Sequence, residues 1–253
     1  MNNKGHEFAL FAPQLSELLK NNPHSITLTD TTLMHRLSHV LRVPLQGQVI
    51  LFDEVIHATC SVMEYAKKQI VLKVINATHN IPVLPKLTVI LPLLKREALD
   101  EVIYACRELG VTSVVLVATE KSSRHTLSAS EWDRLERVSI AAAEQSKNFS
   151  PCSFNSQRTI PTLTAFLETQ QTNQTFMQAQ KWYADPTGKS WQTCIQEKHG
   201  SEFFICVGPE GDLTDNEKTL LQTAGFTFCA LGPTILRAQQ AAVILMGLVR
   251  AGL

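Results

Sequence analysis

The chain has 253 residues, of which 44% are hydrophobic, and its 23 Lys and Arg are balanced by 23 Asp and Glu. The length allows one or two domains with buried cores, and the zero formal charge excludes a global basic field, so any nucleic-acid site must be a local patch. No apolar stretch reaches membrane-spanning length, the N-terminal MNNKGHEFALF has no signal-peptide layout, and the six cysteines include no C-x-x-C pair. We therefore expect a cytoplasmic, reduced protein without a membrane partner or a metal site.

Residues 1–77 are predicted to be mostly β. The stretches HSITLTDTT, GQVILFD and QIVLKVI have the period and the β-branched content of strands. Between the first two of them, LMHRLSHVLRV has a helical pattern with an apolar face formed by Leu33, Leu37, Val40 and Leu41. Its polar face carries His35, Arg36, His39 and Arg42. We expect a small barrel with one short helix. His35 and His39 are one turn apart, but no third ligand accompanies them, so surface or capping roles are favoured over a metal site.

A linker and an α/β domain are predicted next. ATHNIPVLPK, residues 77–86, contains two prolines and is typical of a linker. From residue 86 to 253 short apolar strands alternate with amphipathic helices, which predicts a parallel sheet. The expected elements are a strand KLTVILPLL, a helix from Ala98 ending at Gly110, a strand SVVLVA, a helix capped by Ser130, a helix near Leu163–Leu167 and a strand near Phe176–Tyr183.

Two similar loops follow the last two predicted strands. FFICV, residues 203–207, leads into VGPEGDLTDNE, where Thr214 and Glu217 form a capping box that opens a helix. FCAL, residues 228–231, leads into Gly232-Pro233 and a final helix. Open α/β sheets bind ligands at the carboxyl ends of their strands, although a tight connection without a ligand is the alternative for either loop alone. Neither G-x-x-x-x-G-K-[ST] nor G-x-G-x-x-G occurs, so an NTP or dinucleotide held in the usual way is not expected.

The final helix, in AAVILMGLVRAGL, is apolar nearly all round. Such a helix is buried in a folded protein. Because it ends the chain, we expect a second subunit to cover it.

At these residues the chain resembles RsmE-type 16S rRNA (uracil-N3)-methyltransferases of the SPOUT class, over nearly its whole length. The motifs in their order and spacing carry the resemblance, whereas each motif alone is weak. They are His35–Arg42 (HRLSHVLR), Gly47–Asp53, Lys95 with Glu108–Val111 (ELGV), Ala142–Gln145 (AAEQ), Gly208–Gly211 (GPEG) and Leu231–Arg237 (LGPTILR).

The resemblance implies a fold, a cofactor and partners. It implies a PUA-like β-barrel that binds RNA, residues 1–77, and an α/β SPOUT methyltransferase domain with a C-terminal trefoil knot, residues 86–253. It also implies a homodimer that takes S-adenosyl-L-methionine (SAM) and methylates uracil N3 at a single uridine of 16S rRNA, as naked rRNA or in the assembled small ribosomal subunit. The implied cofactor-binding residues are Val207, Gly208, Pro209, Gly211, Leu231, Gly232, Ile235 and Leu236.

The resemblance also points to side chains for catalysis and RNA binding. Arg237 is the candidate for stabilising negative charge on the uracil ring, and an ion pair with Glu210 is the structural alternative. Glu210 is the candidate for orienting Arg237 or accepting a proton, and stabilisation of the Thr214 helix is its alternative. The candidates for phosphate contacts are Arg36, Arg42, Lys95, Arg96, Lys121, Arg124 and Lys147.

Several positions depart from the family pattern. Asp212 stands where a second glycine is usual, and Ala238-Gln239-Gln240 stands where Thr-Glu-Thr is usual. Ala98 and Asn148 each replace an arginine. These losses motivate an alternative function, a catalytically degenerate member that binds RNA. A transferase for small molecules is less favoured, because it leaves the N-terminal barrel unexplained.

Overall fold

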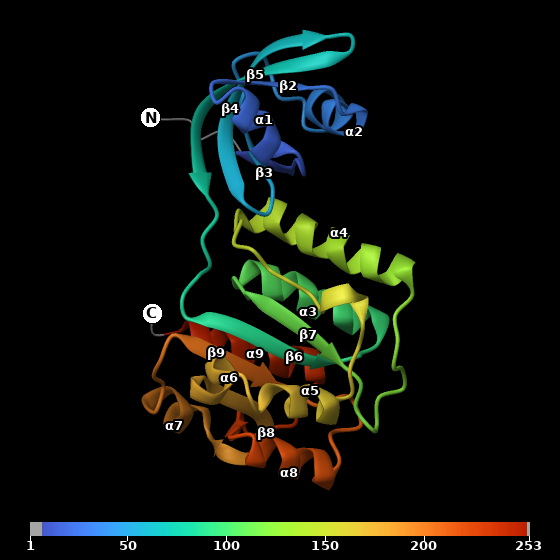
Figure 1. The fold of residues 1–253 in the computed structure, drawn as a ribbon, viewed down its shortest axis with the longest axis vertical. Coiled ribbons are helices and arrows are strands. Elements are labelled where there is room, and N and C mark those ends of the chain that lie inside the picture. The colour runs from blue at the N-terminus through green and yellow to red at the C-terminus, as the bar shows by residue number, and fades with distance from the viewer. Residues whose placement is uncertain (1–6, 252–253) are drawn as a thin grey trace. The chain divides into compact units, whose positions relative to one another are not determined.

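The structure, a computed structural model, describes residues 7–251 and divides the chain into two compact units. The N-terminal unit comprises the described residues up to Ile81 together with Ala143–Pro151, and the C-terminal unit comprises Pro82–Ala142 and the residues from Cys152 onward. Each unit has its own sheet (Figure 1). Part of the N-terminal stretch used in the signal-peptide prediction, residues 1–6, lies outside the described residues. Within the described part, no helix combines the length and the apolar character needed to cross a membrane.

A five-stranded, mainly antiparallel sheet forms the N-terminal unit, in the order β1-β3-β4-β5-β2. The predicted strands are confirmed as β2 (Ser25–Leu28), β3 (Gln48–Phe52) and β5 (Gln69–His79). Three elements were not expected: β1 (Phe8–Phe11), which pairs in parallel with β3, the long hairpin strand β4 (Ile56–Ala66), and helix α1 (Leu15–Asn21). The expectation of one short helix is therefore wrong.

The predicted helix over residues 33–43 is present, but it changes its winding. It begins as α2 (Thr31–His35), where the Asp30 side chain accepts a hydrogen bond from the Leu33 N–H, and continues as a π-helical turn over Arg36–Val40. In this wider turn the Leu41 N–H donates a hydrogen bond to the Arg36 carbonyl. Leu33 and Leu37 are buried as expected, whereas Val40 is 61% exposed. A π turn advances by more than 3.6 residues, so the apolar stripe that an α-helix would bury does not continue to residue 40.

The C-terminal unit contains a five-stranded, fully parallel sheet, which confirms the predicted α/β class. Its order is β10-β8-β9-β6-β7. The strands are β6 (Lys86–Pro92), β7 (Ser113–Val117), β8 (Gln180–Ser190), β9 (Glu202–Cys206) and β10 (Thr227–Ala230). The strand expected from Phe176 begins only at Gln180, because the Asn173 side chain caps a short helix, α6 (Gln174–Gln178), that buries Phe176.

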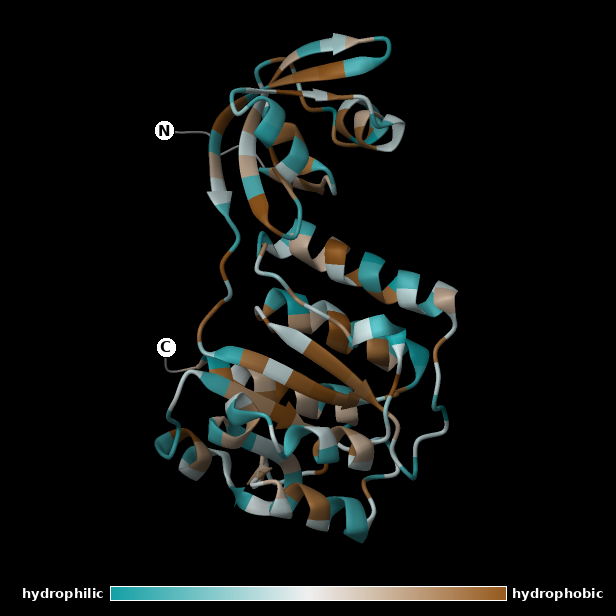
Figure 2. Cartoon of the chain, viewed as in Figure 1, coloured by the Kyte–Doolittle hydropathy of each residue, from teal (hydrophilic) through white to brown (hydrophobic). Residues whose placement is uncertain are grey.

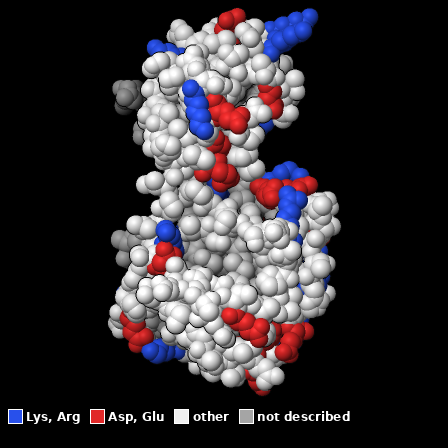
Figure 3. All heavy atoms as spheres, viewed as in Figure 1, with Lys and Arg blue, Asp and Glu red and all other residues white. Residues whose placement is uncertain are grey.

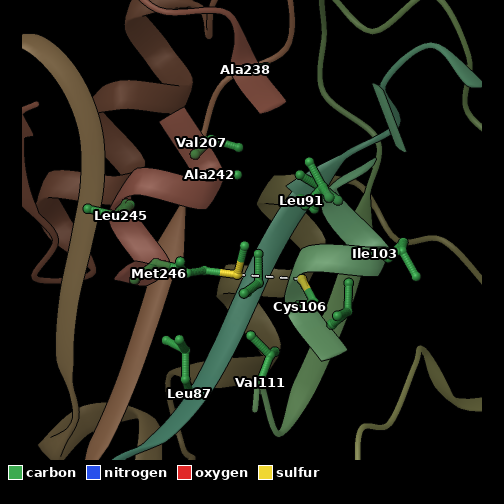
Figure 4. Packing of buried hydrophobic residues seen from close by; sticks show 14 of the residues in the cluster. Leu87, Leu91, Ile103, Cys106, Val111, Val207, Ala238, Ala242, Leu245 and Met246 are labelled. Atoms are coloured by element: carbon green, nitrogen blue, oxygen red, sulfur yellow. Dashed lines mark hydrogen bonds between the residues drawn. The ribbon is translucent and has the colours of Figure 1, made fainter. Parts of the chain in front are cut away.

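Helices cover both faces of this sheet (Figure 1). One apolar cluster joins the sheet to α3 (Arg96–Glu108), α4 (Ala129–Ser146), α7 (Trp191–Gln196) and α9 (Ala238–Arg250), and a second joins it to α5 (Leu163–Gln170), α6 and α8 (Asp215–Thr223). The strands themselves are predominantly hydrophobic (Figure 2). In the first cluster α3 packs against α9, and the Cys106 Sγ lies 3.6 Å from the Met246 Sδ (Figure 4). The helix expected to be capped by Ser130 begins one residue earlier, at Ala129.

Helix α9 is amphipathic, so the expectation that it is apolar and buried all round needs correction. Its inner face, which includes Ala242, Leu245 and Met246, is buried, but Val243 and Ile244 are 37% and 39% exposed. At its C-terminal end the Arg250 guanidinium donates to the carbonyls of Leu109, Gly110 and Pro85. These bonds tie the end of α9 to the end of α3, where Gly110 has the positive φ of 65° expected of a helix-stop glycine.

Candidate functional site

A cleft of about 720 Å³ opens in the C-terminal unit beside the carboxyl ends of β9 and β10. Its wall contains both loops that the sequence singled out, Val207–Asp212 after β9 and Leu231–Arg237 after β10. Lys95 and Ala98, around the start of α3, and Gln239, in the first turn of α9, complete one side. The cleft is therefore built mainly from loop backbone at the edge of a parallel sheet where ligands bind.

The loop after β9 depends on a glycine for its own packing. A Cβ on Gly208 would lie 3.0 Å from an Asp212 carboxylate oxygen and 3.1 Å from the Tyr183 hydroxyl oxygen. Beyond the loop the predicted capping box is confirmed, because the Thr214 side chain accepts from the Glu217 N–H while the Glu217 carboxylate accepts from the Thr214 N–H. Glu217 also accepts from the Glu120 N–H at 2.9 Å, which fixes the start of α8 against the chain that follows β7.

The other two glycines of the predicted cofactor loops differ in what surrounds them. Gly211 is not part of the cleft wall, and a Cβ there would meet the Lys121 Cβ at an ordinary contact distance of 3.5 Å. Gly232 lines the cleft, and no atom lies within 4 Å of a Cβ built on it. Of these two glycines, only Gly232 therefore leaves open space in the wall of the cleft.

A third loop in the cleft wall was missed by the sequence analysis. Between Tyr183 and Lys189 strand β8 leaves its ladder with β10, and Ala184, Asp185 and Pro186 line the cleft. Gly188 lies where the chain returns, and a Cβ there would come within 2.3 Å of the Phe228 backbone. The sequence Asp-Pro-Thr-Gly is a turn signal that could have revealed this loop.

Arg237 and Glu210 both line the cleft, but no ion pair joins them, so this structural alternative finds no support among the described residues. Arg237 is exposed and is the N-cap residue of α9, and its side chain does not cap the helix. Glu210 accepts a hydrogen bond from the backbone N–H of Lys95 at 3.4 Å. Lys95 is the N-cap residue of α3, so the Glu210 charge lies at the N-terminus of α3 and not of the Thr214 helix.

The basic candidates of the C-terminal unit separate into free and paired side chains. Lys95 and Arg96 are exposed and make no ion pair within the described part of the chain, and only Lys95 lines the cleft. Arg124 contacts the Glu131 carboxylate at 2.6 Å. The Ser128 N–H and this guanidinium lower the pKa of Glu131 to about 2. Lys121 donates to the Leu213 carbonyl, behind the loop after β9.

In the N-terminal unit Arg36 is committed to an intramolecular contact. Its guanidinium donates to both carboxylate oxygens of Glu144, at 2.8 and 2.7 Å, and Glu144 also accepts from the Phe11 N–H. The helical pattern could not reveal this partner, which lies 108 residues away in the AAEQ motif. Lys147 donates to the Glu144 carbonyl, whereas Arg42 is exposed and reaches only the His39 carbonyl.

The comparisons with known proteins decide the family. Residues 82–250 match a family model described as an RNA methyltransferase domain. The chain belongs to this RNA methyltransferase family. A curated relative, ribosomal RNA small subunit methyltransferase E of Synechocystis sp., is 27% identical over 243 residues, which cover 90% of this chain and 73% of the relative.

Solved structures of similar proteins share the fold across both units. A ribosomal RNA small subunit methyltransferase E from Neisseria gonorrhoeae bound to S-adenosyl methionine matches with a TM-score of 0.78 and 22% identity, covering 96% of each chain. A methyltransferase from Legionella pneumophila in complex with SAM also matches with a TM-score of 0.78, at 21% identity and 98% coverage of each chain. These matches confirm the predicted fold class of this RNA methyltransferase, while the trefoil knot within it stays a prediction from the family resemblance.

Proposed function

We propose that this protein methylates N3 of a single uridine in 16S rRNA and takes the methyl group from SAM. The observation that carries the proposal is the cleft, in which two loops with the family's GPEG and LGxxILR sequences meet at one sheet edge. The family match and the relative named for small-subunit rRNA methylation support the same substrate class. The cleft and the family match together favour RNA methylation among the functions that the sequence left open.

The residues of the cleft fit SAM. Gly232 leaves open space where a side chain would stand, and we expect the loop backbone that lines the cleft to supply hydrogen-bonding groups for an adenine and a ribose. Leu231, Ile235 and Leu236 provide apolar contact. When bound, SAM supplies a methyl group that its sulfonium already activates. Val207, Gly208, Pro209 and Gly232 are the residues that we expect to hold it, and Gly211 is set back from the cleft.

The remaining chemical problem is the uracil ring, which loses its N3 proton and develops negative charge on its oxygens. Arg237 faces the cleft with a guanidinium that no carboxylate of the described residues neutralises. The first turn of α9 begins at the same place, and the side chain of its N-cap residue, Arg237, does not cap the free N–H groups. A guanidinium and a helix N-terminus together stabilise an anion more than they stabilise neutral uracil, which is the requirement for catalysis.

Glu210 is the candidate for accepting the N3 proton. Its carboxylate is exposed in the cleft and is held at the N-terminus of α3 by one long hydrogen bond, so most of its acceptor capacity remains available. Gln239 lines the cleft where the family usually has an acid, and its amide offers hydrogen bonding without a proton-accepting charge. Glu210 thus carries the base role alone in this proposal.

Methyl incorporation tests the proposed function. The purified protein is incubated with SAM labelled in the methyl group and with small ribosomal subunits, or with naked 16S rRNA, from a strain that lacks the modification. We expect label in one nucleoside, identified as N3-methyluridine by mass spectrometry. Tight RNA binding without incorporation on either substrate would instead establish the catalytically degenerate alternative.

We further propose a cytoplasmic homodimer that contacts RNA through its N-terminal unit and through basic side chains of its C-terminal unit. Val243 and Ile244 form an exposed apolar stripe on α9 with Gly247 beside them, and such a stripe is typical of a subunit interface. For RNA, the candidates without an ion pair among the described residues are Arg42 and Lys147 of the N-terminal unit and Lys95, Arg96 and Lys121 of the C-terminal unit. On the face seen in Figure 3, Lys and Arg are interspersed with Asp and Glu, which favours local contacts over a broad basic surface.

A further inference from the structure

Lys218, in the first turn of α8, stands between two carboxylates from two different loops of the cleft. Its ammonium nitrogen lies 2.8 Å from an Asp185 oxygen and 2.7 Å from an Asp212 oxygen. Asp185 belongs to the loop that leaves β8, and Asp212 belongs to the loop after β9. Both aspartates line the cleft. One side chain therefore links two of the three loops in the wall.

The remaining oxygens of both aspartates are also occupied. The Asp185 side chain is 2% exposed, and its second oxygen accepts from the Thr187 N–H at 2.8 Å and from the Thr187 hydroxyl at 2.6 Å. The second oxygen of Asp212 accepts from the Tyr183 hydroxyl at 2.9 Å and from the Leu213 N–H at 2.7 Å. Because Tyr183 is buried in β8, directly before the loop that leaves the ladder, this bond is a second connection between the two loops.

The backbone of Asp212 has a conformation that glycine adopts without strain. Its φ of 59° lies in the left-handed region, where glycine is unstrained and Asp and Asn are the side chains best tolerated. The carboxylate contacts the Tyr183 hydroxyl and the Lys218 ammonium, and one of its oxygens would lie 3.0 Å from a Cβ on Gly208. Aspartate thus keeps the turn that glycine would make and adds an anchor that glycine lacks.

We propose that Lys218 is a positioning residue: with Asp185 and Asp212 it latches the loops of residues 184–187 and 207–213 in the conformation that receives SAM. This inference rests on the proposed function of the cleft. A pre-organised pair of loops binds its ligand more tightly, because less of the protein has to be shifted into the competent state. The latch therefore acts on cofactor affinity. Arg237 lies outside the two latched loops, and Glu210, within residues 207–213, is in place once SAM has bound.

Three variants test the latch in the full-length protein. Lys218→Met removes both ion pairs, Lys218→Arg retains a cation, and Asp212→Asn keeps a side chain that tolerates positive φ but places a neutral amide against the ammonium. SAM affinity is measured by calorimetry, with the melting temperature as a check on folding. If the fraction of molecules with both loops in the SAM-binding conformation falls to about a tenth in the Met variant, its Kd for SAM rises about tenfold. We expect a similar direction for Asp212→Asn, recovery in the Arg variant, and little change in single-turnover rate at saturating SAM.

The matched control is Lys86→Met, which breaks an ion pair with Glu202 at the opposite end of the sheet and should leave the Kd for SAM unchanged. Wild-type affinity in folded Lys218→Met, or equal losses in the Met and Arg variants, would overturn the latch. If the Met variant does not fold, Asp212→Asn decides by the same criterion. If the wild type binds no SAM, the proposed function fails. Hydrogen exchange of the backbone amides of residues 207–213 then tests the latch alone. An unchanged exchange rate in Lys218→Met or Asp212→Asn would refute the latch.

Discussion

Asp53 shows how a buried charge is satisfied in this chain. It is only 5% exposed, and its carboxylate accepts from the Ser16 N–H at 2.7 Å, the Ser16 hydroxyl at 2.5 Å, and the N–H groups of Val55 and Ile56 at 2.8 Å each. Burial raises the pKa of Asp53, but these four hydrogen bonds to the ionised form outweigh it and leave the pKa below its ordinary value. The carboxylate thus ties the start of α1 to the β3–β4 turn.

The Asp53→Asn variant should lose stability in a pH-dependent way. A depressed pKa stabilises the folded state above the ordinary Asp value of 3.8, and this contribution disappears as the pH falls through the folded pKa. We expect a loss of about 1–3 kcal/mol at pH 7, the scale for impairing charge-assisted hydrogen bonds. Urea unfolding at pH 7 and at pH 3.5 measures the gap between variant and wild type. The gap should narrow at the lower pH, and an equal gap at both values would contradict the assignment.

Arg237 offers the sharpest test of the chemical role of a single side chain. Its guanidinium makes no ion pair within the described residues, so Arg237→Ala should leave the fold intact and SAM affinity nearly unchanged. Turnover should fall roughly a hundredfold or more, the scale for removing one pre-organised donor from a developing anion. Calorimetry and single-turnover methyl transfer separate the two effects. A variant that loses SAM binding but keeps its rate at saturating SAM would assign Arg237 to ground-state binding.

At the scale of elements, the apolar patterns predicted β2, β3 and β5 of the N-terminal sheet and the strands of the parallel sheet, because the burial of a strand follows from the pattern of neighbouring residues. They did not predict β1 or β4, and they placed the start of β8 too early. They failed where a distant contact decides the local structure. The winding of residues 36–40 could not be read from the helical spacing of Leu33 and Leu37. The partner of Arg36 likewise lies 108 residues away. The loop inside β8 differs, because its local Asp-Pro-Thr-Gly turn signal could have predicted it. The two cleft loops were predictable because each carries its own glycine signal.

The glycines of those loops give a prediction about single substitutions. Gly232→Val should place its side chain in the open space of the cleft and weaken SAM binding at least tenfold, while the melting temperature stays close to that of the wild type. Gly211→Ala should bind SAM like the wild type, because its Cβ contacts Lys121 and not the cleft. Calorimetry on both variants checks this contrast. If Gly211→Ala instead weakened SAM binding more than Gly232→Val, the cofactor would have to bind on the Gly211 side of the loop.

At the scale of the whole molecule, each unit has its own core, and neither core depends on a metal or a disulfide among the described residues. The sequence predicted a division into residues 1–77 and 86–253, and it did not indicate that Ala143–Pro151 groups with the N-terminal unit. That assignment depends on Glu144 and Phe149, which contact Arg36 and Phe52. Only a long-range contact could reveal it.

The exposed stripe on α9 predicts how copies of the molecule associate. Val243 and Ile244 are each more than a third exposed, while the opposite face of the same helix is buried in the core. Light scattering at micromolar protein should therefore give twice the chain mass of 28.1 kDa. Ile244→Glu places a charge in the proposed interface, where burial without a partner is costly, and should give the monomer mass. The control Leu220→Glu alters a similarly exposed apolar side chain on α8 and should remain dimeric. A wild-type mass of 28.1 kDa would exclude this interface.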